Sequence, residues 1–302
     1  MHIIYPKPLE AGDRIAIVSP ASKIDPALVD GACRTLSEWG FRPEVSEFCK
    51  GESGSFSGTV DERLRDLRRV FSDSGVRAVL CSRGGYGVVQ LLEHFDVGMF
   101  RRDPKWLIGF SDISALHAYS SFAGVASIHA SMCKHLVELP DDECSRALRS
   151  ILAGELPDYT VEGNPLNREG SAEGTLSGGN MAVLTALLST PYNLLKCDHI
   201  LFIEDISEAI YKIERMLYTM RLDGTLEHTR GLIVGQFTDY KPSIDHSDMY
   251  EMISSMVEGY DFPVAYGFPV GHVDRNLPLV EGAYASLTVS KENVRLTLRR
   301  QA

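Results

Sequence analysis

The sequence of 302 residues has no long apolar run, no cluster of basic residues and no C-x-x-C pair among its six cysteines. Its richest apolar stretch, "MAVLTALLSTPYNLL", meets Ser189, Thr190 and Pro191 well before the ~20 apolar residues that cross a bilayer, so we expect no membrane partner. Acidic residues outnumber basic ones, 41 against 30, and the formal net charge of −11 disfavours nucleic acid as a partner. The opening residues, "MHIIYPKPLEAGDR", lack the basic and apolar regions of a signal peptide, and scattered cysteines fit a reducing compartment. These absences predict a cytoplasmic location.

Several cofactor and metal motifs are missing as well. There is no G-x-x-x-x-G-K-[ST] phosphate loop, and the turn after the first expected strand, "SPASKID", has no G-x-G-x-x-G. There is no H-E-x-x-H or comparable cluster of metal-binding residues. These absences weaken the case for a phosphate-binding loop and predict that the protein binds no metal.

What is present is an alternation of apolar runs and helical periods in the first half of the chain. Residues 14–20, 76–82 and 105–110 are expected strands, whereas 26–39 and 60–73 have helical spacing. Strands separated by helices indicate an α/β fold with a parallel, Rossmann-like sheet flanked by helices.

A change of composition divides the chain. Residues 155–175 are rich in Pro, Gly, Asn and Glu and have little periodicity, which is typical of a domain crossing. We expect an N-terminal α/β domain over 1–156, a linker over 157–173 and a C-terminal domain over 174–302. The C-terminal domain should be mixed α/β, because its last segment, "ASLTVSKENVRLTLRR", alternates like two antiparallel strands.

Two turns follow expected strands of the first domain, "RGGYG" (83–87) and "GFSD" (109–112). Ligands of parallel sheets bind beyond the carboxyl ends of the strands. Ser111 and Asp112 are both favoured as helix N-caps, but a serine between strand and helix also fits a nucleophile elbow. The glycine loop suits either an oxyanion hole or a phosphate cradle, since glycine lets the backbone approach a ligand closely.

A serine nucleophile needs a base and an acid that orients it. Of nine histidines, His129 ends a strand-like run, and His272 lies in a loop between Gly271 and a proline-containing segment. Loops of that kind position side chains for function. Glu204 and Asp205 end the apolar run "HILFIED", where they could orient a histidine or cap the next helix.

Taken together, these segments resemble the LD-carboxypeptidase family of serine peptidases, which comprises the murein tetrapeptide carboxypeptidases and their microcin-immunity relatives. The resemblance covers nearly the whole chain, and its specificity lies in the order and combination of the motifs. These are "GDRIAIVSPAS", "SRGGYG", "KWLIGFSDISALH", "LSGGNMAVL", "LFIEDISEAIYKIERML", "GLIVGQF" and "FPVGHVDRNLPL".

The resemblance assigns roles to residues at matching positions. It implies that Ser111 is the nucleophile, that His272 is the base and that Glu204 orients the histidine. The oxyanion donors would be backbone N–H groups of Asp112 and Gly85. The nucleophile would thus come from the first domain and its two partners from the second.

The implied enzyme is cofactor-free, often a homodimer, and acts on a small muropeptide. It hydrolyses the LD amide bond before a C-terminal D-amino acid, releasing D-alanine from murein tetrapeptide in peptidoglycan recycling. The absence of a long insertion between Asn180 and Leu201 favours this branch over the microcin branch. The alternatives are the same triad acting on a peptidyl-nucleotide antibiotic, or a non-catalytic nucleotide-binding module. Candidate substrate contacts are Arg83, Tyr86 and Asn180, and Arg275 is a further candidate for the terminal carboxylate.

Overall fold

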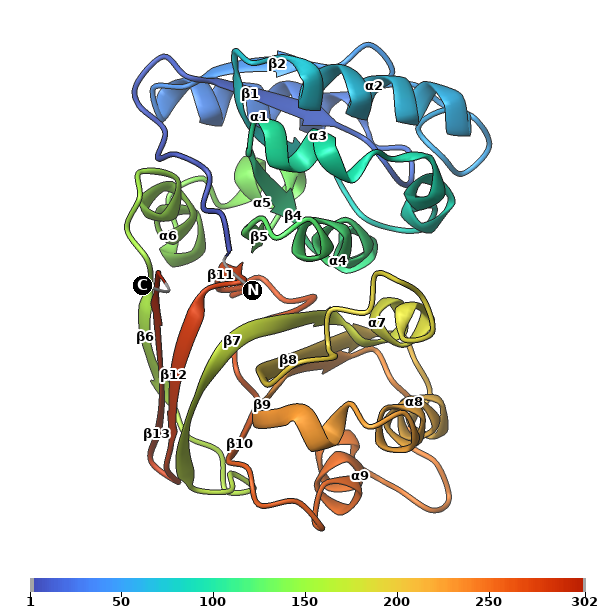
Figure 1. Cartoon of the computed structure of the whole chain (residues 1–302), viewed down its shortest axis with the longest axis vertical. Helices are drawn as coiled ribbons and strands as arrows, with labels where there is room; N and C mark the ends of the chain where they lie inside the picture. The colour runs from blue at the N-terminus through green and yellow to red at the C-terminus, as the bar shows by residue number, and fades with distance from the viewer. Residues whose placement is uncertain (1–2, 301–302) are drawn as a thin grey trace. The chain divides into compact units, whose positions relative to one another are not determined.

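The computed structural model describes residues 3–300, which form two compact units (Figure 1). Unit 1 runs to Glu155 and also includes the later segment Leu277–Val280. Unit 2 comprises Leu156–Asn276 and the chain from Glu281 onward. The chain therefore leaves unit 1, returns to it for one short segment and leaves again.

Unit 1 is built on a six-stranded sheet with the order β11-β5-β4-β3-β1-β2, in which β2, β1, β3, β4 and β5 pair in parallel. The chain order reverses between β1 and β3, and in open α/β sheets ligands bind beside such a switch point. The strands are β1 (Arg14–Val18), β2 (Arg42–Val45), β3 (Val76–Cys81), β4 (Trp106–Gly109), β5 (Ser127–His129) and β11 (Leu279–Glu281).

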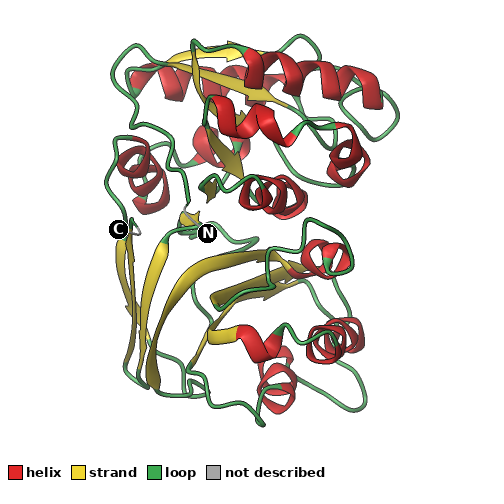
Figure 2. Ribbon diagram, viewed as in Figure 1, coloured by secondary structure: helices red, strands yellow, loops and turns green. Residues whose placement is uncertain are grey.

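The helices of unit 1 form two groups, as expected for a doubly wound sheet: α1 packs on α5, whereas α2, α3, α4 and η1 pack among themselves. Figure 2 distinguishes these helices from the strands that they flank. They are α1 (Pro26–Glu38), α2 (Val60–Ser72), α3 (Val97–Arg102), α4 (Ser114–Phe122), α5 (Cys133–Glu138), α6 (Glu143–Leu152) and the 3₁₀ helices η1 (Val88–His94) and η2 (Ser111–Ile113).

Local sequence explains where these helices begin. Asp25 caps α1 by accepting a hydrogen bond from the backbone N–H of Ala27, and proline occupies the first helical position. Thr59 and Glu62 form a reciprocal capping box at the start of α2. Such caps satisfy backbone donors that have no partner inside the helix.

Unit 2 is built on a seven-stranded sheet with the order β10-β9-β8-β7-β12-β13-β6. Neighbours from β10 to β7 pair in parallel, and those from β7 to β6 pair antiparallel, so the fold is mixed α/β as predicted. The strands are β6 (Asp158–Glu162), β7 (Gly170–Asn180), β8 (His199–Ile206), β9 (Thr229–Thr238), β10 (Val264–Tyr266), β12 (Tyr284–Val289) and β13 (Asn293–Arg299).

The segment 157–173, expected as a linker, differs from that expectation. It contains all of β6 and the start of β7, and β6 pairs with β13 at the edge of the unit 2 sheet. Buried Tyr159 and Val161 alternate with exposed residues along β6. Most of the Gly, Asn and Pro residues that gave the segment its linker-like composition lie between β6 and β7, at 163–169.

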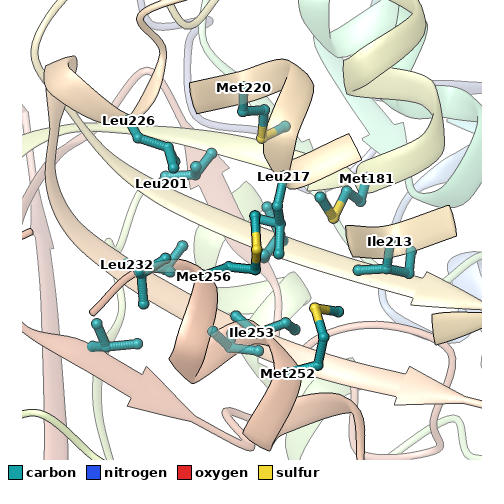
Figure 3. Close-up of a cluster of buried hydrophobic side chains, with 14 of the residues drawn as sticks. Met181, Leu201, Ile213, Leu217, Met220, Leu226, Leu232, Met252, Ile253 and Met256 are labelled. Atoms are coloured by element: carbon teal, nitrogen blue, oxygen red, sulfur yellow. The ribbon is translucent and has the colours of Figure 1, made fainter. Parts of the chain in front are cut away.

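The helices of unit 2 cover a methionine-rich core (Figure 3). They are α7 (Met181–Leu187), α8 (Ile210–Leu222), α9 (Met249–Met256) and the 3₁₀ helix η3 (Leu226–His228). The core includes five of the nine methionines of the chain, whose flexible side chains fill irregular gaps against apolar residues such as Leu201 and Leu232. Within residues 3–300, no helix has the length and apolar character that crossing a membrane requires.

Candidate active site

Ser111 lies on the turn between β4 and α4, at the first position of η2. Its φ is 66°, a left-handed conformation that residues with a side chain rarely adopt. Gly109 permits the tight turn, because a Cβ at that position would lie 2.9 Å from a methyl carbon of Ile113. Neither η2 nor α4 has a side-chain cap, so Ser111 and Asp112 do not fill the N-cap role that the sequence allowed. A strained turn between strand and helix is the geometry of a nucleophile elbow, and the role of Ser111 as nucleophile stays a prediction.

The glycine loop that follows β3 lies directly against Ser111. A Cβ at Gly84 would be 2.9 Å from Cβ and 3.1 Å from Oγ of Ser111, so only glycine fits. Ser22, in the connection that follows β1, holds the loop. Its N–H donates to Gly84 O at 3.3 Å, and its Oγ accepts from the N–H of Tyr86 at 3.3 Å. Gly85 has a φ of 113°, and a Cβ there would meet Ser22 Oγ at 2.1 Å.

The backbone of Asp112 faces the same space. Its nitrogen lies 3.3 Å from the position that a Cβ on Gly84 would take. Asp112 also lies in the first turn of η2, where backbone N–H groups have no acceptor within the helix. This placement suits an oxyanion donor, and the pairing of Asp112 with Gly85 in that role stays a prediction.

The side chain of Asp112 is buried and points to the far end of the glycine loop. Its Oδ2 accepts a hydrogen bond of 2.9 Å from the N–H of Val88. Burial raises the pKa of Asp112 to about 6, against the lowering effects of that hydrogen bond and of the charge on Arg63. Asp112 therefore links the turn of the nucleophile to the loop beside it.

Arg83 and Tyr86, two candidate substrate contacts, lie on the exposed side of this loop. The guanidinium of Arg83 donates to the backbone oxygen of Lys23 at 3.1 Å. The side chain of Tyr86 is 58% exposed, and its ring centroid lies 6.2 Å from that of Phe56. Both residues are accessible from solvent, as a substrate contact requires, and their role stays a prediction.

Unit 2 holds the predicted acid and base together. His272 Nδ1 lies 2.7 Å from Oε2 of Glu204, a carboxylate that is wholly buried near the end of β8. A carboxylate only accepts, so this contact places the hydrogen of the neutral ring on Nδ1 and leaves Nε2 as the basic nitrogen.

The close approach of His272 to Glu204 depends on Gly271. Gly271 has a φ of 129°, and a Cβ there would lie 3.0 Å from both Cβ and Oε2 of Glu204. Its N–H donates to the buried side chain of Asn276 at 2.9 Å, and the N–H of Gln236 on β9 donates to the backbone oxygen of Val270 at 2.8 Å. These bonds hold the histidine loop against the ends of β8 and β9.

The structure also separates Glu204 from Asp205, which the sequence left as alternatives. The two carboxylates have different hydrogen-bond partners. Asp205 accepts from Nδ2 of Asn180 at 3.0 Å and from the N–H of Ala182 at 2.9 Å, so it supports the start of α7 rather than His272. Asn180 itself is buried and caps α7 through Val183 N. Asn180 is also a predicted substrate contact, but its side chain is buried and already bonds to Asp205 and Val183. Its role toward substrate stays a prediction.

The charge state of His272 reflects its neighbours. Burial lowers the pKa of His272, but the hydrogen bond and charge of Glu204, with the charges of Asp205 and Asp239, outweigh burial and raise it above its ordinary value. Asp205 behaves differently, since its burial raises the pKa of that carboxyl to about 6. The pair Glu204–His272 thus favours an imidazolium, as a catalytic base requires once it has taken a proton.

The rival histidine of the first unit, His129, is wholly buried at the end of β5. Its ring lies 5.7 Å from that of Phe110 and 6.4 Å from that of His117, measured between centroids. His117 is buried too, contacts Ser127 Oγ and Gly109 O, and has its pKa lowered by burial to about 4. These surroundings are typical of structural histidines.

Sequence reasoning missed several residues that support the two half-sites, namely Ser22, Arg63, Gln236 and Asn276. Arg63 had a detectable signal. It lies four and seven residues before Leu67 and Val70, so a charged residue falls on the apolar face of an amphipathic helix. The part of the chain that the structure describes contains no group of three His, Cys, Asp or Glu side chains placed to bind a metal.

The fold combines two α/β units, one with a serine on a strained strand–helix turn and the other with a Glu–His pair. Family models match the chain in two places: the "LD-carboxypeptidase N-terminal domain" over residues 15–130 and the "LD-carboxypeptidase C-terminal domain" over residues 173–287. The chain belongs to the LD-carboxypeptidase family, whose members are serine peptidases.

Individual relatives agree. The chain is 33% identical over 296 residues to the probable murein peptide carboxypeptidase of Bacillus subtilis, covering 95% of this chain and 92% of that one. It resembles the crystal structure of muramoyltetrapeptide carboxypeptidase from Oxalobacter formigenes with a TM-score of 0.87 and 25% identity, covering 94% and 98% of the two chains. The MccF-like protein of Bacillus anthracis shares the fold, with a TM-score of 0.88 and 24% identity over 98% of this chain and 99% of that one.

Proposed function

We propose that this protein is a serine LD-carboxypeptidase that removes D-alanine from murein tetrapeptide, acting in the cytoplasm in peptidoglycan recycling. The observation that carries the proposal is Ser111, held at a φ of 66° on a strand–helix turn against Gly84. The similarity to the probable murein peptide carboxypeptidase of Bacillus subtilis supports the substrate class. Six free cysteines among the described residues are compatible with a reducing compartment.

The first half-reaction acylates the enzyme. Nε2 of His272 removes the proton of the Ser111 hydroxyl while Oγ attacks the carbonyl carbon of the amide before the terminal D-alanine. The carbonyl oxygen becomes an oxyanion that accepts hydrogen bonds from the backbone N–H groups of Gly85 and Asp112. As the C–N bond breaks, the imidazolium of His272 gives its proton to the leaving amine. D-alanine departs and an ester on Ser111 remains.

The second half-reaction hydrolyses that ester. His272 takes a proton from a water molecule, whose oxygen attacks the ester carbonyl, and the returning proton restores the hydroxyl of Ser111. Glu204 stays ionised throughout, holds Nδ1–H of His272 and stabilises the imidazolium that forms in each half-reaction. The atoms balance as tripeptide plus D-alanine from tetrapeptide plus water.

Connectivity along the chain supports the pairing of the two half-sites. His272 belongs to unit 2, whereas Leu277, five residues later, begins the segment that belongs to unit 1. The same segment forms β11, next to β5 in the sheet whose strand β4 leads to Ser111. A short covalent connection thus ties the proposed base to the sheet of the proposed nucleophile.

The decisive test is mass spectrometry of muropeptides incubated with the protein and with S111A. Wild type should shorten the tetrapeptide by one alanine, and S111A should fold but keep only the residual rate that binding and the oxyanion hole provide. S121A, which changes a serine at the other end of α4, is the matched control and should retain turnover. Undiminished turnover by S111A would exclude the triad.

The alternatives are outcomes of the same assay. Cleavage of a peptidyl-nucleotide with no action on muropeptide would indicate the activity of the microcin-immunity branch. Binding of a nucleotide without labelling by a serine-reactive phosphonate would indicate a non-catalytic binding module. Because the family resemblance implies a cofactor-free reaction, turnover should persist in EDTA, and inhibition that zinc reverses would contradict the serine mechanism.

Two further features belong to the proposal. We expect the free carboxylate of the substrate to contact Arg83 or Arg275, because release of a terminal residue requires recognition of its charge.

We also expect a homodimer, which light scattering during gel filtration tests directly.

A further inference from the structure

Arg63 on α2 is a buried cation whose side chain is only 2% exposed and whose contacts lie outside its own helix. Its Nη1 donates to the backbone oxygens of Pro20 at 2.9 Å and Gly87 at 3.0 Å, and its Nε donates to Gly58 O at 3.1 Å. Buried charges are costly unless they are well hydrogen-bonded. Such an arrangement calls for a reason beyond simple packing.

The acceptors of Arg63 come from three separate connections of unit 1. Pro20 follows β1, Gly58 precedes α2, and Gly87 is the last residue of the glycine loop that follows β3. The other terminal nitrogen of the guanidinium, Nη2, donates to Oε1 of Gln90 at 2.6 Å. One planar group therefore fixes the glycine loop to two neighbouring loops at once.

The other contacts of the loop show which end Arg63 controls. Ser22 holds the first part of the loop through Gly84 O and Tyr86 N. At the other end Arg63 holds Gly87 O, and Asp112 holds the next backbone N–H, that of Val88. The loop held at both ends by these attachments is the one whose Gly84 packs against Ser111.

The shape of the site explains why arginine is needed. The guanidinium carbon lies 4.7 Å from the centroid of the Phe56 ring, and a Cβ at Gly87 would meet both Nη1 at 2.7 Å and Phe56 at 2.8 Å. The loop therefore rests directly on a flat, stacked cation. Lysine has a single donor centre and cannot serve Pro20, Gly58 and Gly87 in this geometry.

We propose that Arg63 is a positioning residue for the reaction, which holds the glycine loop at the distance from Ser111 that the oxyanion requires. The proposal rests on the proposed function, because it assumes that the loop binds the oxyanion. Oxyanion donors act only when they are preorganised, and a displacement of about 1 Å costs about a hundredfold in rate. Loss of Arg63 should therefore affect the chemical step more than substrate affinity.

A serine-reactive fluorophosphonate tests this in the full-length protein. Attack of the serine oxygen on phosphorus passes through a pentacoordinate centre whose phosphoryl oxygen gains negative charge, and fluoride then leaves, so the reaction needs the same oxyanion donors. We expect R63K and R63M to lower the maximal inactivation rate about tenfold to a hundredfold, with the half-saturating probe concentration changed by less than about twofold. R68M is the matched control, because Arg68 lies on the exposed side of α2 and contacts only the backbone oxygen of His94 among the partners described. A merely structural role of Arg63 would lower the amount of folded protein without this division between rate and affinity.

A second route breaks the same contact from the loop side. In G87A the new methyl group displaces the loop from Arg63, so the rate should fall as in R63K, and the double variant should lose little more than either single one. If the arginine variants do not fold, G87A alone decides. Wild-type-like rates in folded R63K or in G87A, or additive losses, would overturn the proposal. Absence of labelling in wild type would instead refute the serine nucleophile and hence the proposed function.

Discussion

A histidine that serves as a general base must be neutral when it takes the proton of the serine. The net effect of its surroundings raises the pKa of His272 above the ordinary value, so its neutral fraction grows only as the pH rises through that raised pKa. We therefore expect kcat/KM to fall on the acid side, with a midpoint above the ~6.5 of a free histidine. A pH profile of muropeptide hydrolysis measures this directly.

Substitution of the acid shows whether Glu204 is the cause. E204Q keeps a hydrogen-bonding group but removes the charge that favours the imidazolium, so the midpoint should move to lower pH while the plateau rate falls, on the order of 10³–10⁴-fold. D205N is the comparison variant, because Asp205 bonds to Asn180 and the start of α7 and affects His272 only through its charge, so the midpoint should move less than in E204Q. An acid limb that stays in place in E204Q would show that another group controls it.

At this scale the sequence alone predicted some residues and left others open. It singled out Ser111 by position but not by role, because a cap and an elbow have the same residue types. The lack of a side-chain cap excludes the first role, whereas the second stays a prediction that the φ of 66° supports. Arg63 stands out in the sequence as a charge on the apolar face of α2, but its acceptors, which are backbone oxygens of three loops and the side chain of Gln90, do not.

At the scale of the element, the turn between β4 and α4 holds Ser111 in a strained left-handed conformation. An alanine at position 111 would keep the unfavourable left-handed conformation, whereas a glycine would adopt it freely. Both substitutions remove the hydroxyl, so they differ only in backbone cost. We expect S111G to be more stable than S111A by about 1 kcal/mol, or about 2–4 °C in Tm, as thermal unfolding would show. Equal stabilities would mean that the turn relaxes when the serine is lost.

Strands and helices with a clear period were predictable, and those defined by distant partners were not. The expected strand over 76–82 and helix over 26–39 match β3 and α1 to within a residue, because their apolar faces and their caps are local signals. The segment 157–173 reads as polar and irregular, yet β6 forms there by pairing with β13 more than 130 residues later. Such pairing adds order that composition does not reveal.

At the scale of the whole molecule, the least predictable feature is the path of the chain. Leu277–Val280 returns to unit 1 after more than a hundred residues in unit 2 and supplies the edge strand β11. Nothing in a three-residue strand distinguishes the sheet to which it will add. The consequence is that the loop carrying His272 is fixed at both ends, by β9 and β10 in one unit and by β11 in the other.

This topology makes a prediction about stability. Leu279 is wholly buried on β11, and both tryptophans of the chain, Trp39 and Trp106, belong to unit 1. If β11 is an integral strand of unit 1, L279A should lower the free energy of unfolding of that unit by about 2–5 kcal/mol, because a buried leucine truncated to alanine leaves a cavity. The tryptophan fluorescence transition in urea should then move to lower concentration. L287A is the control, since Leu287 is equally buried but lies on β12 of unit 2. It should shift the unfolding transition seen by circular dichroism and leave the tryptophan fluorescence transition in place. An unchanged fluorescence transition in L279A would show that unit 1 folds without β11, and that the loop of His272 is not tied to the sheet that carries Ser111.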